Sequence, residues 1–279
     1  MLTGGVIGLG QIGGGVALCL ARAGILSAVY DIRSDAADHL DGVPAVSTSP
    51  ADVARQSDVI FIAVVTAAQA IDVLTGDGGL LAGVRPGAVV VLLSTVSLED
   101  LDAIGEMTRA AGVPLIDAGV AGGPQSAKKG MILLVGGTKD ALGHARPVLD
   151  AVCKYVAHMG GPGAGMTAKI ARNTVMIGCQ RAGYEGAALA KAYGVDMEQF
   201  VRVMLDADDT GIGPMMFPER KGDPATDPQE ATERDRFRAI MVKDMHSSIK
   251  LASRAGIHVP LIELTLSTAD EIFGFVAHR

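Results

Sequence analysis

A glycine-rich segment near the amino terminus constrains the fold of this chain more than any other feature. It reads Gly8-Leu9-Gly10-Gln11-Ile12-Gly13 and lies between a predicted strand, 3–7, and a predicted helix, 11–23. At this spacing the first glycine makes a tight bend, the second lets backbone approach a pyrophosphate, and the third lets helix and strand pack closely. The free N–H groups at the helix start favour phosphate. We therefore predict a dinucleotide-binding turn.

The next predicted strand, 27–31, ends at Asp31. A carboxylate about 20 residues after the glycines accepts both hydroxyls of an adenosine ribose and repels a 2′-phosphate, which favours NAD. Arg33 follows two residues later, and a guanidinium there can bind a 2′-phosphate, so NADP stays possible. A turn without any ligand is the alternative, because a chain with 36 glycines produces such spacings by chance.

The first half of the chain alternates short apolar runs with segments of helical period, which predicts an α/β sheet. The run 59–63 is apolar at every position, as in a sheet covered by helices on both faces. We predict strands at 3–7, 27–31, 58–63, 88–93 and 114–117, and helices at 11–23, 34–40, 50–56, 67–74, 98–111 and 140–152.

The pattern changes at the breaker run 159–163. Beyond it we predict only helices, at 164–193, 197–205, 237–255 and 260–275, and a solvated, charged loop at 218–236. The first part of the long helix, 163–178, is apolar around most of its circumference, which predicts burial. The expected organisation is an α/β Rossmann domain with a mostly parallel, doubly wound sheet, 1–161, joined by this long helix to an all-α substrate and dimerisation domain, 162–279.

Composition argues against several functions. The 24 basic and 31 acidic residues leave a formal charge of −7, which disfavours a nucleic-acid partner. The longest wholly apolar stretch, 59–65, is far short of the about 18 residues that span a bilayer, so we expect no membrane partner. The 3 widely spaced cysteines favour a cytoplasmic protein over a disulfide framework. The 6 histidines lack metal-ligand spacing, so we predict no metal.

Lys169 and Asn173 lie four residues apart on the predicted helix 164–193 and share one face. A buried ammonium loses hydration, which lowers its pKa toward the range useful for proton transfer. The amide of Asn173 can donate a hydrogen bond to a carboxylate or hydroxyl. A lysine that reaches solvent along the helix surface is the alternative, and these residues alone leave both open.

Two further groups end predicted strands at the same sheet edge. Ala121, Gly122 and Gly123 follow the strand at 114–117, and paired glycines there expose N–H groups that bind carboxylates. A plain tight turn is the alternative. Ser94 and Thr95 either face a ligand or cap the helix that begins near residue 98.

In this order, the motifs resemble those of the β-hydroxyacid dehydrogenase family, which includes 3-hydroxyisobutyrate dehydrogenase and tartronate semialdehyde reductase. The resemblance covers nearly the whole chain. The GLGxMG turn of the family corresponds to residues 8–13 and its DAPVSGG substrate loop to residues 117–123. Its GxGxxxKxxxN signature corresponds to residues 163–173, and its Lys-Asp pair to Lys243 and Asp244.

The resemblance implies reversible NAD(P)-dependent oxidation of a short β-hydroxy acid, such as 3-hydroxyisobutyrate, with Lys169 as general acid/base. It implies that the substrate carboxylate is held by Asn173 and by Ala121, Gly122 and Gly123. The fold it implies has a C-terminal domain like that of 6-phosphogluconate dehydrogenase and forms a homodimer or homotetramer. The expected cofactor-binding residues are Gly8, Leu9, Gly10, Gln11, Ile12, Gly13, Asp31, Arg33, Val64, Val65, Thr95 and Lys243.

Three departures from the family pattern leave the substrate open. Ala121 replaces the serine of the substrate loop, Val64-Val65 replaces a Leu-Pro pair, and the charged loop at 218–236 replaces an apolar segment. The alternatives are reduction of another carbonyl or of an imine on the same scaffold, or a catalytically silent NAD(P)-binding sensor.

Overall fold

The computed structural model describes residues 1–208, 227–272 and 275. The chain forms two compact units, 1–172 and 173–279. Each unit has an apolar core of its own. In the described ranges, no helix is long and apolar enough to cross a membrane.

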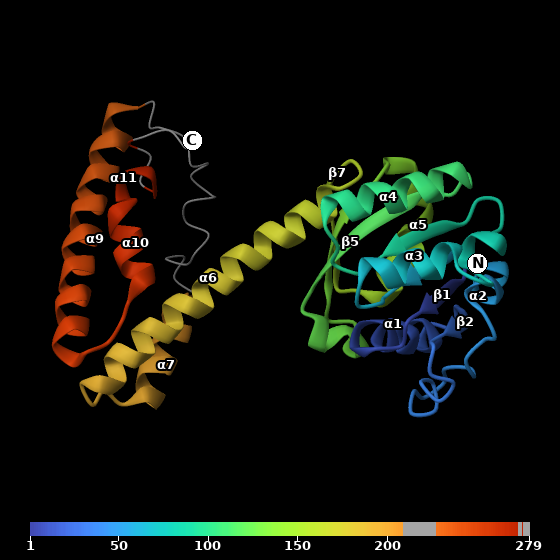
Figure 1. The fold of residues 1–279 in the computed structure, drawn as a ribbon, viewed down its shortest axis with the longest axis horizontal. Coiled ribbons are helices and arrows are strands. Elements are labelled where there is room, and N and C mark those ends of the chain that lie inside the picture. Colours follow the sequence, from blue (N-terminus) through green and yellow to red (C-terminus); the bar gives the residue numbers. More distant parts are fainter. Residues whose placement is uncertain (209–226, 273–274, 276–279) are drawn as a thin grey trace. The chain divides into compact units, whose positions relative to one another are not determined.

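The first unit is built on a seven-stranded sheet (Figure 1). The strand order is β2-β1-β3-β4-β5-β6-β7; β6 runs antiparallel to β5, and the other neighbouring pairs are parallel. Because β2 and β3 lie on opposite sides of β1, the strand order reverses at β1. In α/β sheets, ligands bind at the carboxyl ends of the strands beside such a reversal. The strands are β1 (Gly4–Ile7), β2 (Leu26–Tyr30), β3 (Val59–Ile62), β4 (Val89–Leu92), β5 (Leu115–Ala121), β6 (Ile132–Gly136) and β7 (Tyr155–Gly160).

Helices cover both faces of this sheet and form two cores. In β3, Phe61 packs in the core under α1 and α5, whereas Ile60 and Ile62 pack in the core under α2, α3 and α4. All three side chains are fully buried, and burial of each contributes about 1.5–3 kcal/mol. The helices are α1 (Gln11–Arg22), α2 (Pro50–Gln56), α3 (Ala67–Thr75), α4 (Leu98–Ala110) and α5 (Lys139–Val152), with short 3-10 helices η1 (Leu80–Ala82) and η2 (Gly123–Lys128).

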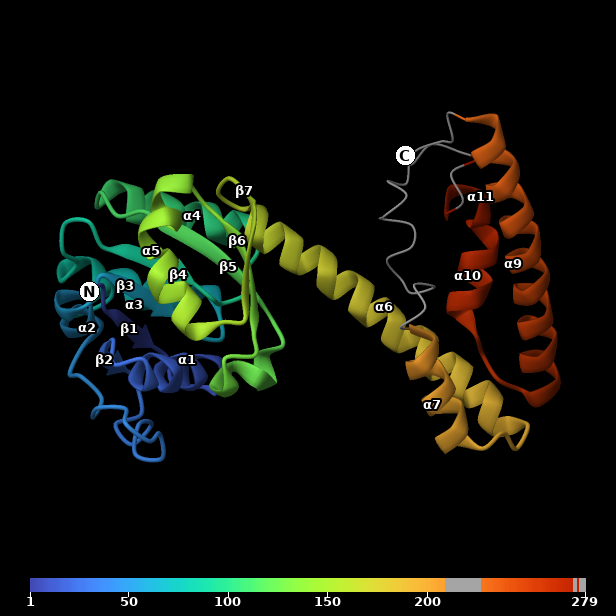
Figure 2. The same cartoon turned by 180° about the vertical axis from the view of Figure 1, so that it is seen from behind.

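The long helix α6 (Ala164–Ala192) starts beside β7 in the first unit and continues into the second (Figure 2). The described part of the second unit is helical. There α10 packs against α9 around Met245. The helices are α7 (Met197–Asp208), α9 (Pro228–Ala255), α10 (Pro260–Ser267) and α11 (Ala269–Ile272).

The predicted helix at 34–40 is wrong, and the predicted strands omit β6 and β7. The 34–40 segment forms successive turns closed by i+3 hydrogen bonds, such as Ala36 N to Arg33 O at 3.2 Å. Serine and aspartate have low helix propensity, and Gly42 and Pro44 follow soon after, so the segment does not continue as a helix. β7 escapes prediction because its outward-facing residues, including His158, are polar or exposed.

The predicted loop at 218–236 is wrong from Pro228 onward, where α9 begins; residues 218–226 lie outside the described residues. The Asp227 side chain accepts a hydrogen bond from Gln229 N at 2.9 Å and caps the helix. The charged residues of this segment then pair along the helix, with Arg234 Nη2 2.6 Å from Glu230 Oε1. The predicted helix at 260–275 is interrupted between α10 and α11, at Thr268.

The predicted burial of the segment 163–178 is wrong for most of its length. Met166 is fully buried, but Ile170 is 41% and Ile177 60% exposed. The described elements of the chain leave this part of the apolar surface uncovered. The reason is that α6 contacts the sheet only through its first turns.

Candidate active site

The three glycines of the turn after β1 have distinct surroundings. Gly8 has φ +88, and a Cβ atom there would lie 2.6 Å from the carbonyl oxygen of Ala63. A Cβ atom at Gly13 would lie 1.8 Å from the carbonyl oxygen of Gly8, so the helix touches the strand end directly. Gly10 has no heavy atom within 4 Å of its Cβ position, and this leaves room for a ligand.

The amino end of α1 is suited to an anion. Its N-cap residue is Gly10, no side chain caps the helix, and its first turn holds no acidic residue. The N–H groups of Gln11, Ile12 and Gly13 therefore lack intrahelical partners and carry the positive end of the helix dipole. This chemistry fits the pyrophosphate of a dinucleotide.

A pocket of about 300 Å³ opens beside this turn, and Asp31, Val64 and Val65 are among its lining residues. Asp31 Oδ2 accepts a hydrogen bond from Leu9 N at 2.7 Å, and Oδ1 accepts from Arg33 N at 3.0 Å and Arg33 Nε at 3.3 Å. Burial raises the pKa of Asp31, but these hydrogen bonds outweigh it and hold the pKa below its usual value. An ionised carboxylate and a guanidinium thus lie together in the pocket.

Ser94 supports the loop that lines this pocket. Its hydroxyl donates to Val64 O at 2.7 Å and accepts from Val64 N at 3.1 Å. The alternative that Ser94 or Thr95 caps the next helix is wrong, because Ser97 is the N-cap of α4 and accepts from Asp100 N at 3.1 Å. Thr95 is exposed at the end of β4.

The glycine loop after β5 lies against the dinucleotide turn. Gly122 has φ +72, a conformation that favours glycine, and a Cβ atom at Gly123 would lie 2.7 Å from Ile12 Cδ1. Ser126, which is buried, donates its hydroxyl to Gln11 O at 2.9 Å and ties η2 to α1. No local sequence pattern indicates a role for Ser126, because its partner Gln11 lies 115 residues away.

Lys169 lies beside the same loop. Its Nζ donates a hydrogen bond to the carbonyl oxygen of Val120, next to Ala121. The backbone is close as well, since a Cβ atom at Gly119 would lie 2.3 Å from Lys169 Cβ. Burial and, to a smaller extent, the charge of Arg172 lower the pKa of Lys169. The structure therefore brings together the candidate base and the carboxyl end of β5.

Two predicted site residues belong to the second unit. Asn173 follows Lys169 by one turn of α6, and it opens the second unit. Lys243 lies on α9, with its side chain 72% exposed and its Nζ atom 3.2 Å from Asp244 Oδ1.

Comparisons with known proteins identify relatives of the whole chain. The model of the NAD binding domain of 6-phosphogluconate dehydrogenase matches residues 3–161. NAD-dependent L-serine dehydrogenase of Pseudomonas aeruginosa is 30% identical over 264 residues, which cover 94% of this chain and 89% of that protein. A crystallised protein from Mycobacterium avium 104 shares 28% identity and a TM-score of 0.86, with full coverage of both chains.

Two further structures are informative. The 3-hydroxyisobutyrate dehydrogenase of Mycobacterium tuberculosis, solved with L-serine, has a TM-score of 0.67 and 25% identity over 97% of this chain and 93% of its own. An imine reductase from Pseudomonas sp. shares the fold, with a TM-score of 0.76 but only 19% identity over 96% and 92% of the two chains. The predicted resemblance is confirmed: this chain belongs to the β-hydroxyacid dehydrogenase family and is an NAD-binding oxidoreductase.

Proposed function

We propose that the protein catalyses the reversible, NAD-dependent oxidation of a short β-hydroxy acid, such as 3-hydroxyisobutyrate or serine, to its semialdehyde or ketone. The observation that carries this proposal is the position of Lys169. Its half-buried ammonium is hydrogen-bonded to Val120, immediately before the glycine loop that packs on the dinucleotide turn. A proton-transfer group, a carboxylate-binding loop and a cofactor turn thus meet within the first unit.

Lys169 would act on the hydroxyl proton. When bound at the turn, NAD supplies the hydride acceptor. In the oxidation direction neutral Lys169 accepts the hydroxyl proton, and in the reverse direction its ammonium returns it and stabilises the developing alkoxide. The lowered pKa increases the fraction of neutral lysine at a given pH, which favours the base.

The glycine loop would hold the acid group of the substrate. The backbone N–H groups of Gly122 and Gly123 can donate to a carboxylate, and Asn173 adds an amide donor on the same helix face as Lys169. Ala121 supplies no hydroxyl, so it leaves the choice of substrate to other groups. A substrate in which one carbon separates the carboxylate from the carbinol carbon fits this donor set.

Asp31 and Arg33 give the cofactor preference a direct test. We expect Asp31→Asn to weaken NAD⁺ binding by about 10-fold, because a neutral amide replaces a charged acceptor of the ribose hydroxyls. The same change removes repulsion of a 2′-phosphate, so NADP⁺ should bind more tightly. Calorimetric titration with both dinucleotides measures this.

The matched control is Arg33→Ala, which keeps the carboxylate but removes the guanidinium held beside it. It should weaken NADP⁺ binding and leave NAD⁺ binding unchanged. Identical affinities in wild-type protein and both variants would show that the pair does not select the cofactor.

A second copy of the chain is the partner we propose for the uncovered apolar side chains. Tyr184 on α6 is 66% exposed, and Val203 and Leu205 on α7 are 62% and 66% exposed. Apolar surface of this extent commonly marks an interface, and twofold dimers are the most frequent oligomers. Sedimentation equilibrium should give the mass of a dimer or tetramer. A monomer mass at all protein concentrations would refute the proposed self-association.

The cysteines suit a reducing compartment, and we place the protein in the cytoplasm. Cys19 and Cys153 are buried free thiols. Burial raises the pKa of Cys153 to about 11, so it stays protonated and unreactive. Fractionation of cells that express the native protein tests the location.

The activity itself is tested by following absorbance at 340 nm with NAD⁺ or NADP⁺ and a panel of short β-hydroxy acids, including 3-hydroxyisobutyrate and L-serine. We expect turnover that prefers NAD⁺ and requires the carboxylate, so matched alcohols without an acid group should fail. Turnover only of imines, or cofactor binding without any turnover, would overturn the proposed function.

A further inference from the structure

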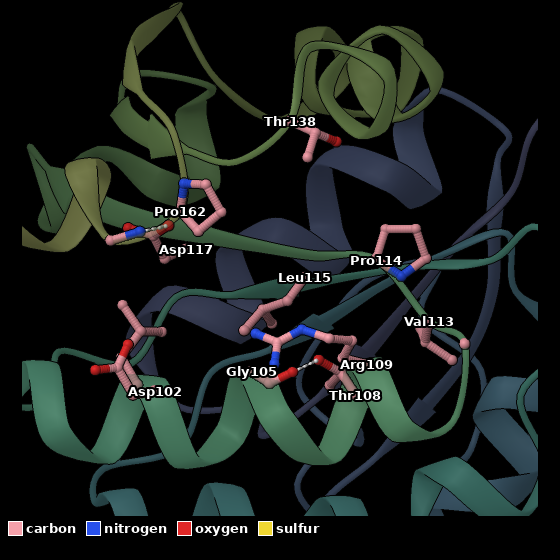
Figure 3. Close-up of a pocket in the computed structure, with 13 residues that line it drawn as sticks. Asp102, Gly105, Thr108, Arg109, Val113, Pro114, Leu115, Asp117, Thr138 and Pro162 are labelled. Carbon is pink, nitrogen blue, oxygen red and sulfur yellow. Dashed lines mark hydrogen bonds between the residues drawn. The ribbon is translucent and has the colours of Figure 1, made fainter.

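Asp117 is a buried carboxylate in the middle of β5. It is 2% exposed, and in the described ranges no cationic side chain lies within ion-pair distance of it. Its partners are two backbone groups at the start of α6: Gly163 N donates to Oδ1 at 2.8 Å and Met166 N to Oδ2 at 2.7 Å. Figure 3 draws the first of these hydrogen bonds. A buried charge requires such partners, and here α6 supplies them.

Through these hydrogen bonds Asp117, a residue of β5, caps the amino end of helix α6. A helix leaves its first N–H groups without intrahelical partners, and a local side chain usually accepts from them. Here the acceptor lies 46 and 49 residues earlier, in the central part of the sheet. Its negative charge also faces the positive end of the helix dipole. The cap therefore attaches the first turn of α6 to β5.

Three glycines allow this attachment. A Cβ atom at Gly165 would lie 2.5 Å from Asp117 O and 2.5 Å from Gly136 N, so helix and strand backbones touch. A Cβ atom at Gly136 would lie 2.6 Å from Gly165 N. Gly119 leaves the same narrow space for Lys169. The backbone of α6 next to Lys169 therefore packs directly against the sheet, which fixes where the Lys169 side chain starts.

Helix α4 supports the first turn of α6 through Met166. This side chain is fully buried in the same apolar core as Ile104 of α4. Elsewhere a pocket of about 380 Å³ opens, and its lining includes Gly105 of α4 together with Asp117 and Gly163 (Figure 3). At this pocket the hydrogen bonds of Asp117 hold the turn.

We propose that Asp117 is a positioning residue that fixes the first turn of α6 and so keeps the Lys169 ammonium against Val120 at the glycine loop. The proposal rests on the proposed function, in which Lys169 transfers the proton. Asp117 touches neither substrate nor cofactor in this scheme. It acts on the reaction only through the place and hydration of Lys169.

Asp117→Asn tests the proposal, because asparagine keeps the size but can accept only one of the two N–H groups well. We expect kcat for hydroxy-acid oxidation to fall by up to about 10²-fold, the scale of a misplaced catalytic group, with NAD⁺ affinity unchanged. A loosened, better hydrated Lys169 should also move the ascending limb of the pH profile of kcat to higher pH.

Thr138→Ala is the matched control. Thr138 caps α5 through a 3.2 Å hydrogen bond from Ala141 N and lines the same pocket. This variant should lower the melting temperature without changing kcat or the pH profile. Lys169→Ala, measured in parallel, separates the two proposals, because wild-type turnover in that variant would refute the role of Lys169 itself.

A pH profile of Asp117→Asn that coincides with the wild-type profile, with kcat reduced only by the unfolded fraction, would overturn the positioning role. If this variant does not fold, Asp117→Ser, which keeps one acceptor for the helix, undergoes the same measurements. Failure of both variants to fold would show that Asp117 serves stability and would also overturn the proposal.

Discussion

Replacing Lys169 with alanine is expected to lower kcat for hydroxy-acid oxidation by about 10²–10⁴-fold, the usual contribution of a general acid/base. The dissociation constant for NAD⁺ should not change, because the dinucleotide turn and its pocket contain no atom of Lys169. The truncated side chain also removes the hydrogen bond to Val120, but that carbonyl group lies at the end of a strand already paired with β6. Initial rates at saturating cofactor, with calorimetry for NAD⁺, measure both quantities.

The pH profile distinguishes proton transfer from simple charge stabilisation. If neutral Lys169 is the base, kcat for oxidation rises with pH through the pKa of Lys169. Burial and then Arg172 lower that pKa, so the rise should lie below the usual range of a lysine. Lys169→Arg keeps a cation but cannot lose its proton at any usable pH, so it should be as inactive as alanine in oxidation. Full activity of the arginine variant would refute base catalysis.

Local sequence patterns predicted most of the first unit. The predicted strand at 58–63 and helix at 50–56 match β3 and α2 closely, because apolar runs and a Ser-Pro start are signals within the segment itself. The turns at 34–40 and the beginning of α9 were missed for the opposite reason. At 34–40 the serine and aspartate residues lower the helix propensity, whereas at the start of α9 charges that pair along the helix stabilise it.

The candidate site was predictable only in part. The glycines of the turn, Asp31 and Lys169 stand at spacings that sequence motifs record. The capping by Asp117 and the bond from Ser126 join residues 46 to 115 positions apart. The hydrophobic periodicity of the sequence cannot predict such contacts, because they depend on how distant elements such as β5 and α6 pack. A polar residue inside an apolar strand, as at Asp117, is the available signal.

The dinucleotide turn should fail when Gly13 is replaced by alanine. The new Cβ atom would lie 1.8 Å from Gly8 O and 3.1 Å from Ala63 Cβ. Gly8 has little room to retreat, since its N–H group is bonded to Tyr30 O at 2.8 Å and its backbone already lies close to the carbonyl group of Ala63. We expect a loss of about 1–3 kcal/mol of stability, with NAD⁺ binding weaker by about 10²-fold because the start of α1 must move.

Gly10→Ala is the matched variant that separates folding from binding. Its backbone has φ −67, which alanine adopts readily, and no heavy atom lies within 4 Å of the Cβ position. Melting temperature should therefore stay at the wild-type value or rise slightly. The added methyl group would nevertheless occupy the space through which backbone approaches the pyrophosphate, so NAD⁺ binding should weaken. If Gly10→Ala binds NAD⁺ as the wild type does, the pyrophosphate does not lie on this turn, whatever the effect at Gly13.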